Sequence, residues 1–221
     1  MRIISLSALM AASVSIMSAG IIVTPEAAGV THTTVANTVT EDFNSFSTGA
    51  FSGLTPIGTY SSGGRIVAAD TFSGDGTKYL STGAQSSPST SYTLTFNAPQ
   101  TFFGLLWNAM DAQNSLTINT NGGSTTYTSA NFTGLSNAYK GNPGNTSQDS
   151  GEFFVYLDFS GTLGTTFNSV TFSNSGTSTG FETDNHSILA STVPEPSTYG
   201  MLFAGFAALA IAARRRSARK F

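Results

Sequence analysis

Two acidic residues and an amide toward the C-terminal end of the chain are the clearest candidates for chemistry. Glu182, Asp184 and Asn185 lie in a run that has the character of a strand. Because successive side chains of a strand point to opposite faces, Glu182 and Asp184 share one face. Two like charges on one face indicate that the face contacts either solvent or a cation. Clustered oxygen ligands of this kind suit calcium. The calcium-binding loop motif D-x-D-x-D-G, however, is not present in the sequence. Asp75, between two glycines, is a separate loop candidate.

Enzymatic chemistry has weaker support. Cysteine is absent, which excludes a thiol nucleophile, a disulfide and a zinc-thiolate site. His186 follows two acidic residues, but no serine stands in a G-x-S-x-G elbow, so a solvated histidine at a strand end is favoured over a triad. A glycan hydrolase needs two opposed carboxylates, for which the candidates are Asp111, Asp158, Glu182 and Asp184. We expect a protein that is not an enzyme and has no catalytic residue.

Trp107 is the only tryptophan, and it ends an apolar run that begins at Phe102. Aromatic side chains bury large apolar areas, so burial in the core is the favoured role. The alternative is a sugar-stacking platform like those of carbohydrate-binding modules, in which Trp107 would contact a ligand.

The charged residues are unevenly distributed. The chain has nine basic residues, and five of them lie in its last eight positions. Between residues 29 and 193, three basic residues stand against ten acidic ones. A body with this excess of negative charge repels phosphate backbones, so we expect no nucleic-acid partner.

Residues 29–191 have the composition of an all-β domain. They are rich in Ser, Thr, Gly and Asn, and they keep the aromatic residues that a disordered segment lacks. Residues 92–96 alternate as in a half-buried strand, and Asn121-Gly122-Gly123 predicts a hairpin turn. Further strands are predicted at residues 64–69, 78–81, 101–107, 115–120, 124–128, 153–159, 167–173 and 180–189, with a long loop at 134–151. Without a helical period between them, a single antiparallel β-sandwich of jelly-roll-like topology is predicted.

Residues 1–28 have the pattern of a secretory signal peptide. Arg2 is followed by an uncharged stretch, residues 3–23, and then by small residues at Ala27 and Ala28. The stretch is long for the apolar region of a signal peptide, so a permanent membrane anchor is the alternative. Cleavage near Ala28 is favoured, and Ala19 is a second candidate.

Residues 192–221 contain three elements in order. Pro194-Glu195-Pro196 is followed by an apolar segment, residues 199–213, and by the cluster Arg214-Arg215-Arg216. At about 1.5 Å per residue the segment makes a helix of about 22 Å, a short transmembrane helix beside a hydrocarbon core of about 30 Å. The arginines would hold that end in the cytoplasm as a basic anchor. The prolines keep the motif out of the helix and open to a processing enzyme.

Together these three elements resemble the PEP-CTERM sorting signal of Gram-negative bacteria. The resemblance implies that an exosortase, a membrane-embedded enzyme similar to a cysteine protease, recognises and processes the tail during export. Residues 103–107, 114–117 and 180–185 are also similar to a group of exosortase-dependent surface proteins that has no assigned biochemical activity. The plain alternative for the tail is a membrane anchor with a proline linker.

The resemblance implies an exported protein of the cell surface or extracellular matrix, with one C-terminal membrane helix before processing. The expected role is structural or adhesive and is linked to exopolysaccharide and biofilm. Extracellular polysaccharide is therefore an expected partner besides the exosortase and the membrane. The alternatives are a carbohydrate-binding module and a secreted glycan hydrolase. No cofactor is expected, apart from calcium if the acidic face binds a cation.

Overall fold

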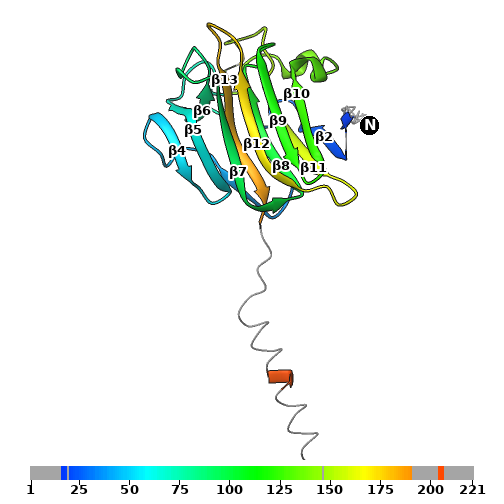
Figure 1. Ribbon diagram of the computed structural model, residues 1–221. Helices are drawn as coiled ribbons and strands as arrows, with labels where there is room; N and C mark the ends of the chain where they lie inside the picture. Colours follow the sequence, from blue (N-terminus) through cyan, green and yellow to red (C-terminus); the bar gives the residue numbers. More distant parts are fainter. Residues whose placement is uncertain (1–15, 19, 146, 191–203, 207–221) are drawn as a thin grey trace, which may run out of the picture. The chain divides into compact units, whose positions relative to one another are not determined.

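A computed structural model describes residues 16–18, 20–145, 147–190 and 204–206 of the chain. The chain divides into two compact units, Met1–Leu189 and Ala190–Phe221. The regular structure of the first unit consists mainly of antiparallel strands, which confirms the prediction of an all-β fold (Figure 1). In the second unit, the described residues 204–206 are helical. Within the described parts of the chain, no helix has the length and apolar character needed to cross a membrane.

Thirteen strands and two short 3-10 helices follow one another along the described chain. The strands are β1 (Ile16–Ser18), β2 (Ile21–Pro25), β3 (Thr38–Glu41), β4 (Gly49–Leu54), β5 (Gly58–Val67), β6 (Tyr79–Thr82), β7 (Ser91–Gln100), β8 (Phe102–Asn108), β9 (Asn114–Thr120), β10 (Gly123–Thr128), β11 (Val155–Gly161), β12 (Phe167–Asn174) and β13 (Phe181–Leu189). The helices η1 (Ser129–Phe132) and η2 (Asn137–Tyr139) lie between β10 and β11.

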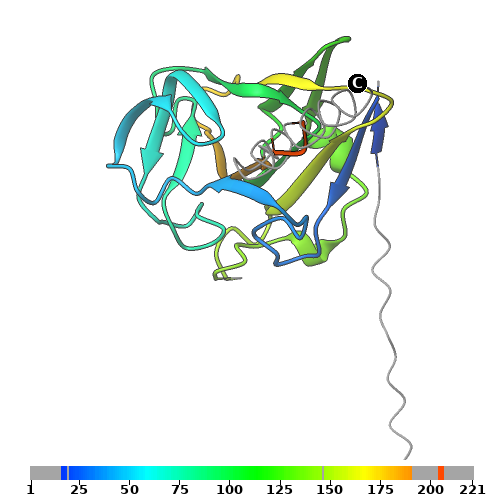
Figure 2. The ribbon, with the colours of Figure 1, turned by 90° about the horizontal axis from the view of Figure 1, so that it is seen from below.

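Hydrogen bonds join the strands into one sheet with the order β1-β2-β11-β8-β13-β6-β5-β7-β12-β9-β10, while β3 pairs with β13 and β4 with β5. The sheet is curled, because strands far apart in this order meet across the interior (Figure 2). Phe172 of β12 stacks on His186 of β13 with 5.0 Å between ring centroids. Tyr127 of β10 packs against Phe159 of β11 at 5.1 Å. One curled sheet thus encloses the core, where two separate sheets of a sandwich were expected.

The strand pattern of the sequence is reproduced in most of this sheet. On β7, Tyr92, Leu94 and Phe96 are buried, as the alternation predicts. β9 and β10 form a hairpin in which Thr120 lies opposite Gly123, so Asn121 and Gly122 make the predicted turn. The interior is strongly aromatic. Its largest fully buried side chains are Trp107, Tyr60, Tyr92, Tyr127, Tyr156, Phe43, Phe103, Phe154, Phe159, Phe167, Phe172 and Phe181.

β8 and β13 are covered on both faces. Every residue of β8 is buried, and so is every residue of β13 except the last. The inner faces line the core, and loops cover the outer faces. Gly74, in the loop before β6, approaches β8 so closely that a Cβ atom there would meet the Oδ1 of Asn108 at 2.5 Å. Asn142 holds two of the covering loops together by donating from Nδ2 to the carbonyl oxygens of Thr71 and Ser73, at 2.7 and 3.0 Å.

The strand β2 lies within the segment whose sequence indicates a signal peptide. It pairs with β11 over five positions, from Ile21 opposite Gly161 to Pro25 opposite Leu157. Ile21 and Val23 are 0% and 1% exposed and belong to the hydrophobic core. The sheet therefore begins upstream of residue 29, where the folded body was expected to begin.

Candidate functional site

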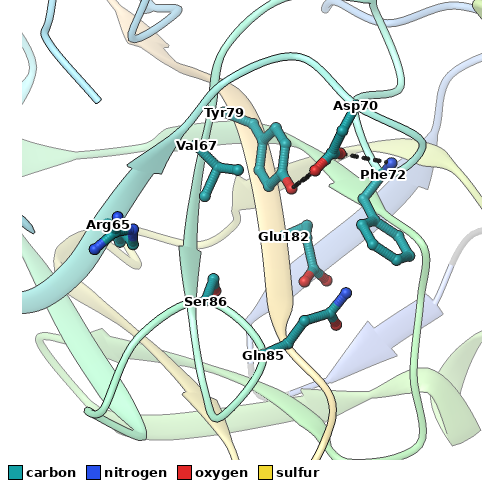
Figure 3. A pocket seen from close by; sticks show the side chains of 8 residues that line it. All are labelled: Arg65, Val67, Asp70, Phe72, Tyr79, Gln85, Ser86 and Glu182. Carbon is teal, nitrogen blue, oxygen red and sulfur yellow. Dashed lines mark hydrogen bonds between the residues drawn. The ribbon is translucent and has the colours of Figure 1, made fainter. Parts of the chain in front are cut away.

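A pocket of about 300 Å³ lies beside β13 and contains the side chain of Glu182 (Figure 3). Its residues come from distant parts of the chain, because β6 pairs with β5 on one side and with β13 on the other. Ser81 of β6 lies opposite both Arg65 of β5 and Glu182 of β13. The residues that line the pocket are Arg65, Val67, Asp70, Phe72, Tyr79, Gln85, Ser86 and Glu182.

Glu182 is a buried carboxyl group with few partners. Ser81 donates from its hydroxyl to Oε1 of Glu182 at 3.4 Å. Gly180 leaves the room for this carboxyl, because a Cβ atom there would lie 2.0 Å from Oε1. Burial raises the pKa of Glu182 to about 8, and the charges of Asp111 and Glu152 also raise this pKa. At neutral pH the group is mostly protonated, so it can donate a hydrogen bond as well as accept one.

Tyr79 and Asp70 form the second polar pair of the pocket. The hydroxyl of Tyr79 donates to both carboxylate oxygens of Asp70 at 3.1 Å, and the backbone N–H of Phe72 donates to Oδ1 at 2.9 Å (Figure 3). Burial, followed by the charge of Asp70, raises the pKa of Tyr79. Tyr79 therefore stays un-ionised, and Asp70 holds its ring in place.

The pocket combines hydrogen-bonding groups with aromatic surface. Arg65 is exposed, whereas Tyr79 and Glu182 are buried. Gln85 and Ser86 add an amide and a hydroxyl, and Phe72 adds a second ring. Convergent polar groups beside apolar surface are typical of small-ligand sites.

Asp184 lies on the outer side of β13, like Glu182, but its partners are different. Its Oδ1 accepts from the backbone N–H of Asn185 at 2.7 Å, and Nδ2 of Asn185 donates to Oδ2 of Asp75 at 2.9 Å. Burial raises the pKa of Asp184 well above its usual range, and the neighbouring Asp75 raises it further. The structure thus brings Asp75 to Asp184 and Asn185, although the sequence shows it only as a separate loop candidate.

The three residues predicted to bind calcium lie in two different environments, the pocket beside β13 and the contact with Asp75. Glu182 lines the pocket, whereas Asp184 and Asn185 contact Asp75. Among the described residues, no group of three or more His, Cys, Asp or Glu side chains is placed to hold a metal ion. Calcium binding by Glu182, Asp184 and Asn185 stays a prediction.

Asp158 belongs to a third environment, on β11. Thr33 donates from its hydroxyl to Oδ2 of Asp158 at 3.1 Å. Burial raises the pKa of Asp158, and the carboxyl group of Glu26 beside it raises this pKa further. Burial also raises the pKa of Asp111. Neither Asp111, Asp158 nor Asp184 lines the pocket that contains Glu182.

His186 lies in the core, which corrects the expectation of a solvated histidine at a strand end. Its Nδ1 is 2.7 Å from the hydroxyl of Tyr60, and its Nε2 is 2.9 Å from that of Thr183. Burial lowers the pKa of His186 to about 3, so the ring is neutral at ordinary pH. The reason is a β-bulge: the register of β13 against β8 shifts between Asp184 and Ser187, and Asn185 has a φ of 50°. The extra residue turns His186 inward.

Trp107 is fully buried. It is 0% exposed, and its ring packs against Phe181 at 4.6 Å and against Phe132 at 6.0 Å. Stacking on a sugar requires an exposed ring face. The aromatic side chains that line the pocket beside β13 are those of Phe72 and Tyr79.

The sorting residues lie outside the described part of the chain, namely Pro194, Glu195 and Pro196 together with Arg214, Arg215 and Arg216. Residues 192–216 match the family model of the PEP-CTERM protein-sorting motif. The chain carries this motif, which is a substrate signal for exosortase and indicates an exported protein with a C-terminal sorting signal. No match was found among curated proteins or solved structures.

The pocket contains residues that sequence reasoning missed. Residues 78–81 were predicted as a strand, but no motif distinguishes Tyr79 from other strand tyrosines. Its partner Asp70 and the rim residue Arg65 become neighbours only through the pairing of β5 with β6. The one feature of the sequence that could have indicated this pocket is Arg65, an isolated basic residue in an acidic body.

Proposed function

We propose that this is an exported protein whose tail is processed by an exosortase, and which then has a non-enzymatic structural or adhesive role at the cell surface or in the extracellular matrix. The observation that carries the proposal is the match of residues 192–216 to the PEP-CTERM protein-sorting motif. The role includes contact with exopolysaccharide, as in a biofilm. Before processing, residues 199–213 span the membrane once.

The division of the chain supports processing at the tail. The last strand, β13, ends at Leu189, and the second unit begins at Ala190. The sorting motif lies entirely in this second unit. Cleavage there removes no strand of the described sheet and leaves its core complete. The prolines of Pro194-Glu195-Pro196 disfavour both helix and strand pairing, which keeps the motif open to an enzyme.

The experiment compares the full chain with a variant in which Pro194, Glu195 and Pro196 are all replaced by alanine. Both are expressed in a Gram-negative host that contains the exosortase, and the mass of the surface-exposed protein is measured. We expect the wild-type chain to lose its tail and the variant to retain it. The single substitution Ser197→Ala is the matched control and should be processed. Removal of the tail from the triple variant would contradict the proposal.

A second candidate function is binding of extracellular polysaccharide in the pocket beside β13. Its support is the lining itself, in which Arg65, Glu182 and Gln85 can hydrogen-bond to hydroxyl groups next to two aromatic rings. The hydrolase alternative has less support. Asp70, the other carboxylate of the pocket, uses both of its oxygens to hold Tyr79.

The pocket is tested on an array of extracellular polysaccharides with the exported protein. Arg65→Ala removes a charged donor from the rim, where the side chain is exposed, and should weaken binding by about tenfold or more. Lys140→Ala makes the same change of charge at another exposed position and should bind like the wild type. Equal affinity of all three proteins, or no binding by any of them, would exclude this function.

A further inference from the structure

The contacts of the first residues of the folded body indicate where the signal peptide, or leader, ends. From Gly20 onward the chain is part of the fold. The carbonyl oxygen of Gly20 accepts two hydrogen bonds from Thr162, from the backbone N–H at 2.7 Å and from the hydroxyl at 3.1 Å. The five pairs of β2 with β11 follow directly. Ile21 and Val23 are buried and belong to the hydrophobic core.

The contacts continue past β2. The backbone N–H of Glu26 donates to the carbonyl oxygen of Tyr156 at 2.9 Å, and the hydroxyl of Tyr139 donates to the carbonyl oxygen of Glu26 at 2.7 Å. The side chain of Glu26 accepts from the N–H and hydroxyl of Thr34, at 2.6 and 2.7 Å. Only at Ala27, Ala28 and Gly29 does the chain become exposed. Cleavage after Ala28 would remove all of the preceding contacts.

We infer that the leader is removed at the Ala19–Gly20 bond, so that the mature chain begins with Gly20 and keeps β2. Signal peptidases act on the unfolded chain during translocation, so a strand that supplies core side chains, as β2 does, must lie downstream of the cut. Cleavage after Ala19 leaves in place the pairing of β2 with β11 and the hydrogen bonds of Gly20 and Glu26. It removes β1, which pairs with β2 at three positions on the edge of the sheet.

This boundary also explains the unusual length of the N-terminal apolar stretch. Residues 3–23 are uncharged, whereas the apolar region of a signal peptide has about 7–15 residues. If the leader ends at Ala19, residues 3–17 form an apolar region of ordinary length, and Ala19 is the small residue directly before the cut, while Met17 stands two positions earlier. The apolar side chains of Ile21 and Val23 then belong to the core and not to the leader.

The inference rests on the proposed export, and the test separates the two. The full chain is expressed in a Gram-negative host with the exosortase, and the first and last peptides of the exported protein are identified by mass spectrometry. We expect a chain that begins with Gly20. A chain that begins with Gly29, or one that keeps Met1, would overturn the inference. The C-terminal peptide reports on the exosortase independently of either result.

Two variants place a bulky residue before each candidate bond. Ala19→Tyr should block removal of the leader and cause the precursor to accumulate. Ala28→Tyr, at an exposed position, is the matched control and should be processed like the wild type. Normal processing of Ala19→Tyr together with a block in Ala28→Tyr would contradict the inference.

Discussion

The two ends of the chain carry similar apolar stretches, residues 3–23 and 199–213, yet they relate differently to the fold. The N-terminal stretch ends in β2, whose Ile21 and Val23 are buried in the core. The C-terminal stretch begins after the last strand, in a separate unit. Hydropathy is the same kind of signal at both ends. Hydropathy alone does not show that residues 21–23 at the end of the first stretch pair with β11 in the sheet.

The largest expected effect comes from removing the N-terminal strand. We compare two soluble proteins that both end at residue 190, one beginning at Gly20 and the other at Gly29. Loss of Ile21 and Val23 from the core costs about 3–6 kcal/mol, so the melting temperature should fall by about 10 °C or more. Thermal unfolding followed by circular dichroism measures this. Equal melting temperatures would mean that β2 contributes nothing to stability.

A single side chain of β2 gives a sharper and smaller test. Val23→Ala removes two buried methyl groups and should reduce the free energy of unfolding by about 2 kcal/mol, including the cavity that it leaves. Val35→Ala is the matched control at an exposed position, 37% exposed, and should change the free energy by less than about 0.5 kcal/mol. Urea unfolding of both variants distinguishes a core position from a surface one.

The stability of the protein should also depend on pH, because the carboxyl group of Asp158 on β11 lies beside that of Glu26, which follows β2. Because the pKa of Asp158 is raised in the folded protein, its contribution is fully present below about pH 4 and is lost as the pH rises toward neutrality. Asp158→Asn should therefore be more stable than the wild type at pH 7 and equal to it near pH 4. Solvent screens the charges of this partly exposed pair, which reduces the effect. We therefore expect the melting temperature of Asp158→Asn at pH 7 to exceed that of the wild type by about 2–4 °C.

The control for this comparison is Asp42→Asn, at an exposed carboxylate. Its melting temperature should follow that of the wild type across the same pH range. A stabilisation of Asp158→Asn that is the same at pH 4 and pH 7 would show that ionisation of Asp158 is not its cause.

The smallest effect on stability is expected at the other end. Deletion of residues 192–221 removes no strand of the sheet, so the melting temperature should change by less than about 2 °C. The same deletion should abolish processing by the exosortase. A large loss of stability would show that the tail packs on the folded body, and the contrast between the two ends would then fail.

Much of the sheet could be predicted from the sequence, because alternation and turn residues are local signals. The strands from β6 to β13 and the turn at Asn121 and Gly122 were found in this way. β3 and β4 were not. β4 has a single buried apolar side chain, Phe51, between glycines, and β3 has only a partly buried Val39, so neither has a clear period.

The site was less predictable for a different reason. Strict alternation places His186 on the same face as Glu182 and Asp184, and only the bulge at Asn185 turns it inward. The pocket depends on β6 pairing with both β5 and β13, which no local pattern shows. The sorting motif, by contrast, could be recognised from its residues, since its elements are adjacent in the chain.

The measurement that tests the central claim most directly is the intact mass of the mature protein from cells with and without the exosortase. We predict a chain that begins with Gly20 in both strains and that loses everything beyond the Pro194-Glu195-Pro196 region only when the exosortase is present. Survival of the arginine cluster in both strains would contradict the account, because the tail would then be a membrane anchor and not a sorting signal.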